Sequence, residues 1–192
     1  MSGTHKRRII VGISGASGII YGIRALELLA RAGIETHLVM SKAAEMTLAY
    51  ETDYKAKDVR DLAGVNHPVG DIGASISSGS FHTLGMLIAP CSIRTMSEIA
   101  TGTTGTLMSR AADVVLKERR RLVLGIRETP LHTGHLRTLT QLSEMGAVIC
   151  PVVPAFYNRP TSLDDVVNHT VGRMLDLFDI DVGAVKRWKA DE

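Results

Sequence analysis

Short apolar runs alternate with helical patterns along most of the chain. Five runs rich in β-branched and aliphatic residues are bounded by Gly, Pro or Ser and predict strands at residues 8–12, 36–40, 84–89, 122–126 and 147–150. Apolar positions at helical spacing predict helices at residues 20–32, 41–50, 92–101, 107–119, 132–145 and 163–177. Because the strand runs are apolar throughout, we expect both faces of each strand to be buried. The order of elements therefore predicts an α/β fold, a parallel sheet covered by helices on both faces.

The length of the chain favours one domain. Its 192 residues are enough for a single core and too few for two ordinary domains, and no repeat or long linker divides them. We expect one domain over residues 1–192, with a flexible N-terminus at residues 1–7. Residues 66–83, NHPVGDIGASISSGSFHT, are a Gly/Ser-rich stretch, which we interpret as either a flexible lid or an ordered loop at a subunit contact.

The composition of the chain indicates an oligomer and excludes a general affinity for polyanions. The hydrophobic share is 45% and the mean hydropathy is +0.12, which is high for a monomer whose polar surface must cover one small core. Lys and Arg number 22 against 20 Asp and Glu, so no net field attracts nucleic acid or an anionic membrane. The KERRR run at residues 117–121 lacks interleaved aromatic residues and precedes a predicted strand, which favours a solvated helix end.

The N-terminus and the cysteines indicate a cytoplasmic protein. The basic start MSGTHKRR is followed by an apolar segment that glycine breaks within a few residues, so neither a signal peptide nor a membrane span is expected. Cys91 and Cys150 are the two cysteines, and neither has the spacing of a zinc ligand. We expect both to be free thiols in a reducing compartment.

The stretch VGISGASGIIYG, residues 11–22, joins the first predicted strand to the first helix. Gly12, Gly15 and Gly18 permit close approach of a ligand, and N–H groups at the helix start predict an anion site suited to phosphate. The spacing G-x-x-G-x-x-G matches neither the dinucleotide fingerprint nor a P-loop. Ser41 follows the second strand, where an NAD-binding unit usually has an acidic residue, which disfavours nicotinamide. A tight turn without a ligand is the alternative.

Polar residues also follow the third and fourth predicted strands. Ser92, Arg94 and Thr95 stand at the start of a helix, where they suit a second part of the same ligand. Taken alone, they are better explained by a serine N-cap and a solvent-facing arginine. Arg127 and Glu128 end the fourth strand, and a charged pair there is not expected in a core.

Two further segments carry candidate polar groups. Arg110 and Lys117 are seven residues apart on a predicted helix, so they lie nearly on one face after two turns. Prolines stiffen a loop at residues 151–160 that presents Phe156 and Tyr157. Phe156 suits a hydrophobic plug equally well, whereas the Tyr157 hydroxyl needs a polar partner.

Seven motifs in order resemble the flavin prenyltransferase family of the UbiX type. They are GISGASGIIYG, ETHLVMSKAA, ASISSGSF, PCSIRT, RAADVVLKERR, RETPLH and PAFYNRP, and the resemblance extends over residues 8–187. It implies a Rossmann-like flavoprotein fold, a dodecamer built from trimers, and transfer of a dimethylallyl group to N5 and C6 of reduced FMN without a metal. The implied donor is dimethylallyl phosphate, with monophosphate or diphosphate left open. The product, prenylated FMN, would serve a UbiD-type decarboxylase of ubiquinone synthesis or of phenolic acids.

The resemblance also implies roles for individual residues. The implied cofactor contacts are Gly15, Ala16, Ser17, Ser41, Ser92, Ile93, Arg94, Thr95 and Arg127. The implied ligands of the donor phosphate are Arg110, Lys117, Arg127, Tyr157 and Arg173. The implied catalytic residues are Ser17, Glu51, Lys117 and Glu128, with acid–base work at the two glutamates and a proton relay at the serine.

Two other functions are weighed against this one. An FMN-dependent cysteine decarboxylase of the same superfamily would carry an Asn-containing PASANT motif and a Met-Asn loop, where this chain has PCSIRT and RETPLH. A non-catalytic FMN carrier would need no acid–base pair, which Glu51 and Glu128 supply. We also expect the active site to be shared between subunits, because the charged loops and residues 66–83 are too short to close a pocket within one chain.

Overall fold

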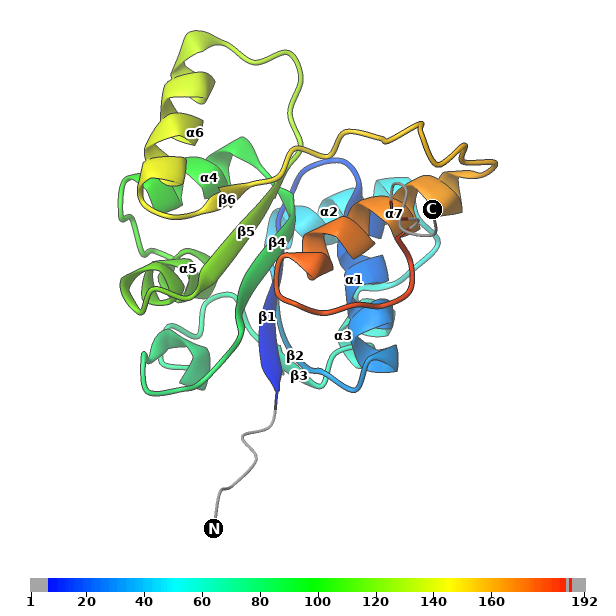
Figure 1. Ribbon diagram of the computed structural model, residues 1–192. Helices are drawn as coiled ribbons and strands as arrows, with labels where there is room; N and C mark the ends of the chain where they lie inside the picture. Colours follow the sequence, from blue (N-terminus) through cyan, green and yellow to red (C-terminus); the bar gives the residue numbers. More distant parts are fainter. Residues whose placement is uncertain (1–6, 186, 188–192) are drawn as a thin grey trace.

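The computed structural model describes residues 7–185 and residue 187. Of the predicted flexible N-terminus, residues 1–6 therefore lie outside the described part of the chain. The remainder contains a sheet of six parallel strands in the order β3-β2-β1-β4-β5-β6 (Figure 1). The strands are β1 (Arg8–Ile13), β2 (Glu35–Met40), β3 (Val65–His67), β4 (Gly85–Cys91), β5 (Arg121–Ile126) and β6 (Val148–Ile149).

Helices cover both faces of this sheet (Figure 1). On one side lie α1 (Ile19–Arg31), α2 (Lys42–Glu51), α3 (Ala56–Asp61) and α7 (Leu163–Asp176). On the other side lie α4 (Ile93–Ala100), α5 (Leu107–Lys117) and α6 (Thr133–Glu144), with a short 3-10 turn, η1 (Ser75–Ser77), against α5. The prediction of a parallel α/β sheet with helices on both faces is confirmed.

Alternate residues of each strand face opposite helix layers. In β1, Ile9 and Val11 belong to the core cluster beneath α1 and α7, whereas Ile10 belongs to the cluster beneath α4 and α5. All three are buried. A strand covered on both faces favours apolar residues at every position, which is why β1, β4 and β5 are almost uninterrupted apolar runs in the sequence.

The sequence analysis missed two short elements, β3 and α3. β3 is an edge strand of three residues, and two of them, Val65 and Asn66, are exposed, so no apolar run marks it. α3 has six residues, of which only Val59 is buried. Elements this short and this polar carry too little hydrophobic periodicity to be predicted.

The Gly/Ser-rich stretch at residues 66–83 is an ordered loop. Ile76 in η1 is buried among residues of α5 and β4. The Leu107 N–H donates to the Val69 carbonyl at 2.8 Å, and the Arg120 guanidinium donates to the carbonyls of Phe81 and Gly79 at 2.7 and 2.6 Å. These bonds hold the segment against the start and the end of α5. Its use at a subunit contact stays a prediction.

The cysteines are both free, as the sequence analysis expected. Burial raises the pKa of the Cys91 thiol to about 12, so this thiol is neutral at any physiological pH. Among the described residues, no helix is both long and apolar enough to cross a bilayer.

Close packing of α1 on the sheet gives a first prediction. A Cβ built at Gly22 would lie 2.5 Å from the Ala89 carbonyl oxygen and 2.7 Å from Ile13 Cδ1, and both atoms belong to the buried sheet. Gly22→Ala should therefore lower the free energy of unfolding by about 1–3 kcal/mol through overpacking. Urea denaturation measures the change. Gly105→Ala is the matched control, because a Cβ there meets no atom within 4 Å. Equal stability of the two variants would contradict the prediction.

Candidate functional site

Two loops at the carboxyl edge of the sheet are joined by a buried serine. Ser14 follows β1 and is 1% exposed. Its hydroxyl donates to the Pro90 carbonyl at 2.9 Å and accepts from the Ser92 N–H at 2.7 Å. The strand order reverses between β1 and β4, which is where open α/β sheets bind ligands. The sequence analysis missed Ser14, although a lone hydroxyl directly after an apolar strand was a usable signal.

A cavity of about 280 Å³ opens beside this junction. Five residues predicted as cofactor contacts line it, namely Gly15, Ser41, Ser92, Arg94 and Thr95. Val69, in the ordered loop at residues 66–83, and Thr106, at the start of α5, also line the cavity. The fold thus brings together residues that the sequence places up to 80 positions apart, from Gly15 to Thr95.

Three helices begin at this cavity, each capped by a hydroxyl. Ser41 accepts from the Ala44 N–H at the start of α2, and Ser92 accepts from the Thr95 N–H at the start of α4. Thr106 accepts from the Ser109 N–H at the start of α5. The first N–H groups of a helix have no partner within the helix and carry partial positive charge. Three such termini around one cavity favour an anionic ligand. For Ser92, the N-cap and the ligand interpretation are therefore compatible.

Gly15 is required by the close approach of the first loop to α2. A Cβ built at Gly15 would lie 2.4 Å from Ala43 Cβ, a separation that real Cβ atoms do not show. Ala16 and Ser17 continue the loop, with the Ala16 N–H donating to the Ser14 carbonyl and Ser17 exposed.

The start of α1 differs from the expectation of a ligand phosphate. The Glu51 carboxylate, at the end of α2, accepts from the Gly18 N–H at 2.8 Å and from the Ile19 N–H at 3.0 Å. The helix terminus and the two N–H groups both stabilise a negative charge there. The anion at this helix is therefore the chain's own glutamate, held next to Ser17.

Arg127 and Glu128 follow β5 on the same edge, as predicted. The Arg127 N–H donates to the Cys91 carbonyl at 3.2 Å, and both side chains are exposed. Burial raises the pKa of the Tyr21 phenol, and the charge of Arg127 partly offsets this effect, so the two side chains are within electrostatic reach. The Glu128 carboxylate accepts from the Thr129 N–H at 2.9 Å.

Tyr157 and Arg173 form a second group of predicted site residues. Tyr157 lies on the loop that runs from β6 to α7 (Figure 1) and contacts His169 of α7, with Oη and Nε2 3.1 Å apart. Arg173 comes one helical turn after His169 and pairs with Asp176. The sequence analysis missed His169, because a histidine on a predicted helix gives no local sign of its tertiary partner.

Lys117 does not join these groups within one chain. It ends α5, pairs with Glu118 and lies next to Gly79, in the loop that leads to the amino end of β4. Arg127 follows the other end of β5, and six residues of strand span about 20 Å. Arg110, near the start of α5, is closer to the carboxyl edge and pairs with Asp113. The structure therefore separates Lys117 from the other predicted phosphate ligands.

The chain matches a family model and curated relatives over most of its length. The family model described as Flavoprotein matches residues 2–180. A flavin prenyltransferase UbiX of Escherichia coli strain K12 is 64% identical over 175 residues, which cover 91% of this chain and 93% of the relative.

Solved structures share the fold closely. The crystal structure of AnUbiX (PadA1) in complex with FMN and dimethylallyl pyrophosphate has a TM-score of 0.95 and 52% identity, covering 97% of this chain and all of that one. A dodecameric FMN-dependent UbiX-like decarboxylase from Escherichia coli O157:H7 has a TM-score of 0.93 and 48% identity, covering 95% of this chain and all of that one.

The Glu51 contact gives a prediction for stability. Glu51→Ala removes the acceptor at the start of α1 and should lower the free energy of unfolding by about 1 kcal/mol, as loss of a helix cap does. Glu51→Gln keeps an acceptor and loses the charge, so its effect should be smaller. Urea denaturation compares the two with Glu144→Ala, an exposed glutamate at the end of α6. A Glu51→Ala protein as stable as the Glu144→Ala control would remove the capping role.

Proposed function

This chain belongs to the UbiX-type flavin prenyltransferases, and we propose that it attaches a dimethylallyl group from dimethylallyl phosphate to N5 and C6 of reduced FMN. The observation that carries the proposal is the cavity at the carboxyl edge, where predicted cofactor contacts gather around three helix N-termini. We also treat residues 1–192 as one flavoprotein domain.

The residues of the cavity fit FMN. Helix N-termini and the hydroxyls of Ser41, Ser92 and Thr95 suit its phosphate and polar groups, and Ile93 and Arg94 contribute N–H groups of the first turn of α4. When bound in reduced form, FMN supplies the electron-rich N5 and C6 positions. Nothing in this chemistry requires a metal, so we propose a metal-independent transferase.

Cationic and hydroxyl groups serve the departing phosphate in this proposal. Negative charge grows on the phosphate as the allylic C–O bond breaks, and guanidinium and phenol groups that donate hydrogen bonds stabilise it. We assign this role to Arg110, Lys117, Arg127, Tyr157 and Arg173. Arg127 and Tyr157 are both partly open to solvent at the carboxyl edge, where a ligand can reach them.

Proton transfer falls to Glu51, Glu128 and Ser17. Bond formation at C6 releases a proton, so a base is needed there. Glu51 and Glu128 lie on opposite sides of the β1 loop, on α2 and after β5, and Ser17 is adjacent to the Gly18 N–H that holds Glu51. We propose that a glutamate carboxylate accepts the proton released at C6 and that the Ser17 hydroxyl relays a proton between the flavin and the departing phosphate.

We propose a homododecamer with active sites shared between subunits. Lys117 lies at the far edge of its own sheet, so it can join the phosphate only at another subunit. Large apolar side chains on α2, on the loop before α7 and at the start of α7 are exposed, namely Met46, Tyr50, Val153, Phe156 and Leu163. Burial of such side chains between copies accounts for the high mean hydropathy.

The product would pass to a UbiD-type decarboxylase, and we place the enzyme in the cytoplasm. Two free cysteines fit a reducing compartment. Neither the cysteine decarboxylase nor the carrier interpretation explains the combination of PCSIRT, RETPLH and the glutamate pair.

Anaerobic incubation with reduced FMN and dimethylallyl monophosphate tests the reaction. Mass spectrometry of the released flavin should show the mass of one added five-carbon prenyl unit, with chelator present throughout. Dimethylallyl diphosphate is the parallel donor. Unchanged FMN with both donors, in protein shown to bind FMN, would contradict the transferase.

Glu51→Gln should bind FMN normally and form product 10²- to 10⁴-fold more slowly, roughly the range for loss of a general acid or base. An undiminished rate would favour a different base.

Mixing of two inactive variants tests the shared site. Lys117→Met and Glu128→Gln should each lack activity alone, yet coexpression should restore roughly one quarter of it, because random assembly leaves about one shared site in four intact. If both residues acted within one chain, no mixed assembly would contain an intact site and activity would stay absent. Sedimentation of the mixture confirms that the oligomer forms, and an active monomer would also contradict sharing.

A further inference from the structure

An exposed tyrosine of the proposed phosphate site is anchored by a buried histidine. Tyr157 is 48% exposed on its loop, whereas His169 is 5% exposed on α7. Tyr157 Oη lies 3.1 Å from His169 Nε2, and the rings meet edge to face with centroids 5.5 Å apart. In the described part of the chain, this contact links the loop before α7 to the helix that carries Arg173.

His169 is neutral in this environment. Burial and the nearby charge of Arg173 lower its pKa, and the opposing charge of Asp176 is a smaller effect. A neutral imidazole carries one proton, so one ring nitrogen donates and the other accepts.

The hydrogen bonds indicate which nitrogen carries the proton. Nδ1 of His169 is buried and has no hydrogen-bond partner among the described residues. A buried N–H without a partner is rarer and more costly than a buried acceptor without one. The proton therefore belongs on Nε2, where Tyr157 Oη accepts it.

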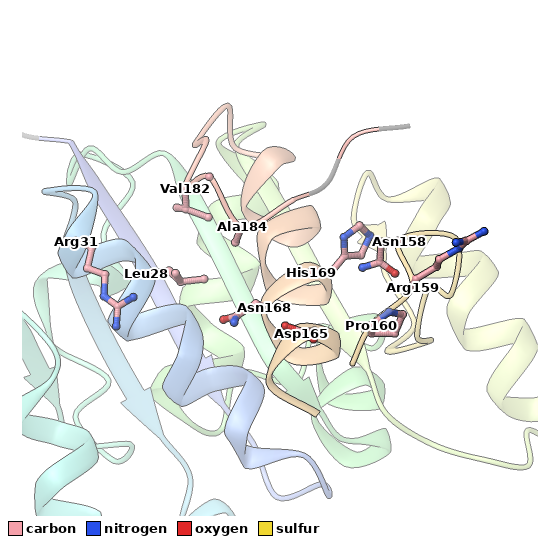
Figure 2. A pocket seen from close by; sticks show the side chains of 11 residues that line it. Leu28, Arg31, Asn158, Arg159, Pro160, Asp165, Asn168, His169, Val182 and Ala184 are labelled. Atoms are coloured by element: carbon pink, nitrogen blue, oxygen red, sulfur yellow. The ribbon is translucent and has the colours of Figure 1, made fainter. Parts of the chain in front are cut away.

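The surroundings of His169 agree with this assignment. His169 and Asn158 both line a cavity of about 480 Å³ along α7 (Figure 2). Asn158 Oδ1 is likewise buried without a partner among the described residues. Neither atom is the partner of the other, so Asn158 Oδ1 offers no acceptor to a proton on Nδ1.

We propose that His169 is a positioning residue for the donor phosphate, acting through Tyr157. The His169 Nε2–H donates to Tyr157 Oη, so the tyrosine accepts with its oxygen and directs its own O–H to a phosphate oxygen. In the opposite tautomer, Nε2 would accept a hydrogen bond from the tyrosine O–H. The tyrosine would then present only oxygen lone pairs to an anion. Arg173, one turn further along α7, adds positive charge beside the same ligand. The inference rests on the proposed function, because it takes the dimethylallyl phosphate as the ligand.

Binding without turnover tests this role. Calorimetry on the oligomer loaded with oxidised FMN measures the Kd of dimethylallyl monophosphate. His169→Leu, which keeps a side chain of similar bulk and removes the donor, should raise this Kd roughly five- to tenfold, the loss expected for one neutral hydrogen bond. His169→Gln, whose amide can donate to Oη, should stay within about threefold of the parent. The affinity for FMN itself should not change in either variant.

Thr170→Val is the matched control for the fold of α7. Thr170 is the buried neighbour of His169, and in the described part of the chain its hydroxyl bonds within the helix, to the Val166 carbonyl at 2.8 Å. This variant should bind the phosphate as the parent does. A loss in Thr170→Val as large as in His169→Leu, or an equal loss of FMN affinity in His169→Leu, would show a merely structural role and overturn the proposal.

A double variant separates this proposal from the assignment of Tyr157. In a Tyr157→Phe background, His169→Leu should cause no further loss, because its effect passes through the tyrosine. Additive losses would overturn the proposal.

A parent that binds no dimethylallyl monophosphate and forms no product would instead refute the proposed function. A parent that binds it, with His169→Leu binding equally well, would refute only the role of His169. Solid-state ¹⁵N NMR of the histidine-labelled parent and of His169→Gln identifies which ring nitrogen of His169 carries the proton. A protonated Nδ1 would also overturn the proposal.

Discussion

Burial of a parallel sheet on both faces is the constraint on which the rest of the structure depends. Every strand runs the same way, so each loop that follows a strand emerges at one edge, and apolar helices occupy both faces. The polar groups that follow β1, β2, β4 and β5 therefore all lie at this carboxyl edge. The hydroxyl of Ser14 then fixes the loops after β1 and β4 to each other at the point where strand order reverses.

The electrostatics of the site come from local groups, since the whole chain has a formal net charge of only +2. Helix N-termini capped by Ser41, Ser92 and Thr106 surround the cavity and supply partial positive charge, and no lysine or arginine is buried in the described part of the chain. At α1 the same physics acts on the protein itself, because the terminus holds the Glu51 carboxylate. Helix N-termini thus account both for a cavity suited to an anionic ligand and for the fixed carboxylate of Glu51 at the start of α1.

Helix direction explains why Lys117 lies apart from the other residues that we propose to bind the donor phosphate. In a parallel α/β sheet a helix that begins at the carboxyl edge ends at the amino edge, so α5 starts at the cavity and carries Lys117 away from it. Tyr157, by contrast, lies on the loop before α7 and contacts His169 of that helix, and Arg173 lies on α7 itself. The proposal that sites are shared between copies rests on this geometry and on the apolar side chains that the single chain leaves exposed.

The sequence by itself determined the parallel α/β class, five of the strands, the helices that flank them and the polar positions at their ends. Apolar runs and helix caps such as Ser92, which accepts from the Thr95 N–H, are local patterns, set within one strand or one helical turn. Only the tertiary structure decided that Glu51 meets Gly18 across 33 positions, that Tyr157 meets His169, and that Lys117 lies at the opposite edge from Arg127. The short, polar β3 and α3 also escaped prediction. These contacts depend on the order of the strands and the direction of the helices, which a short stretch of sequence does not specify.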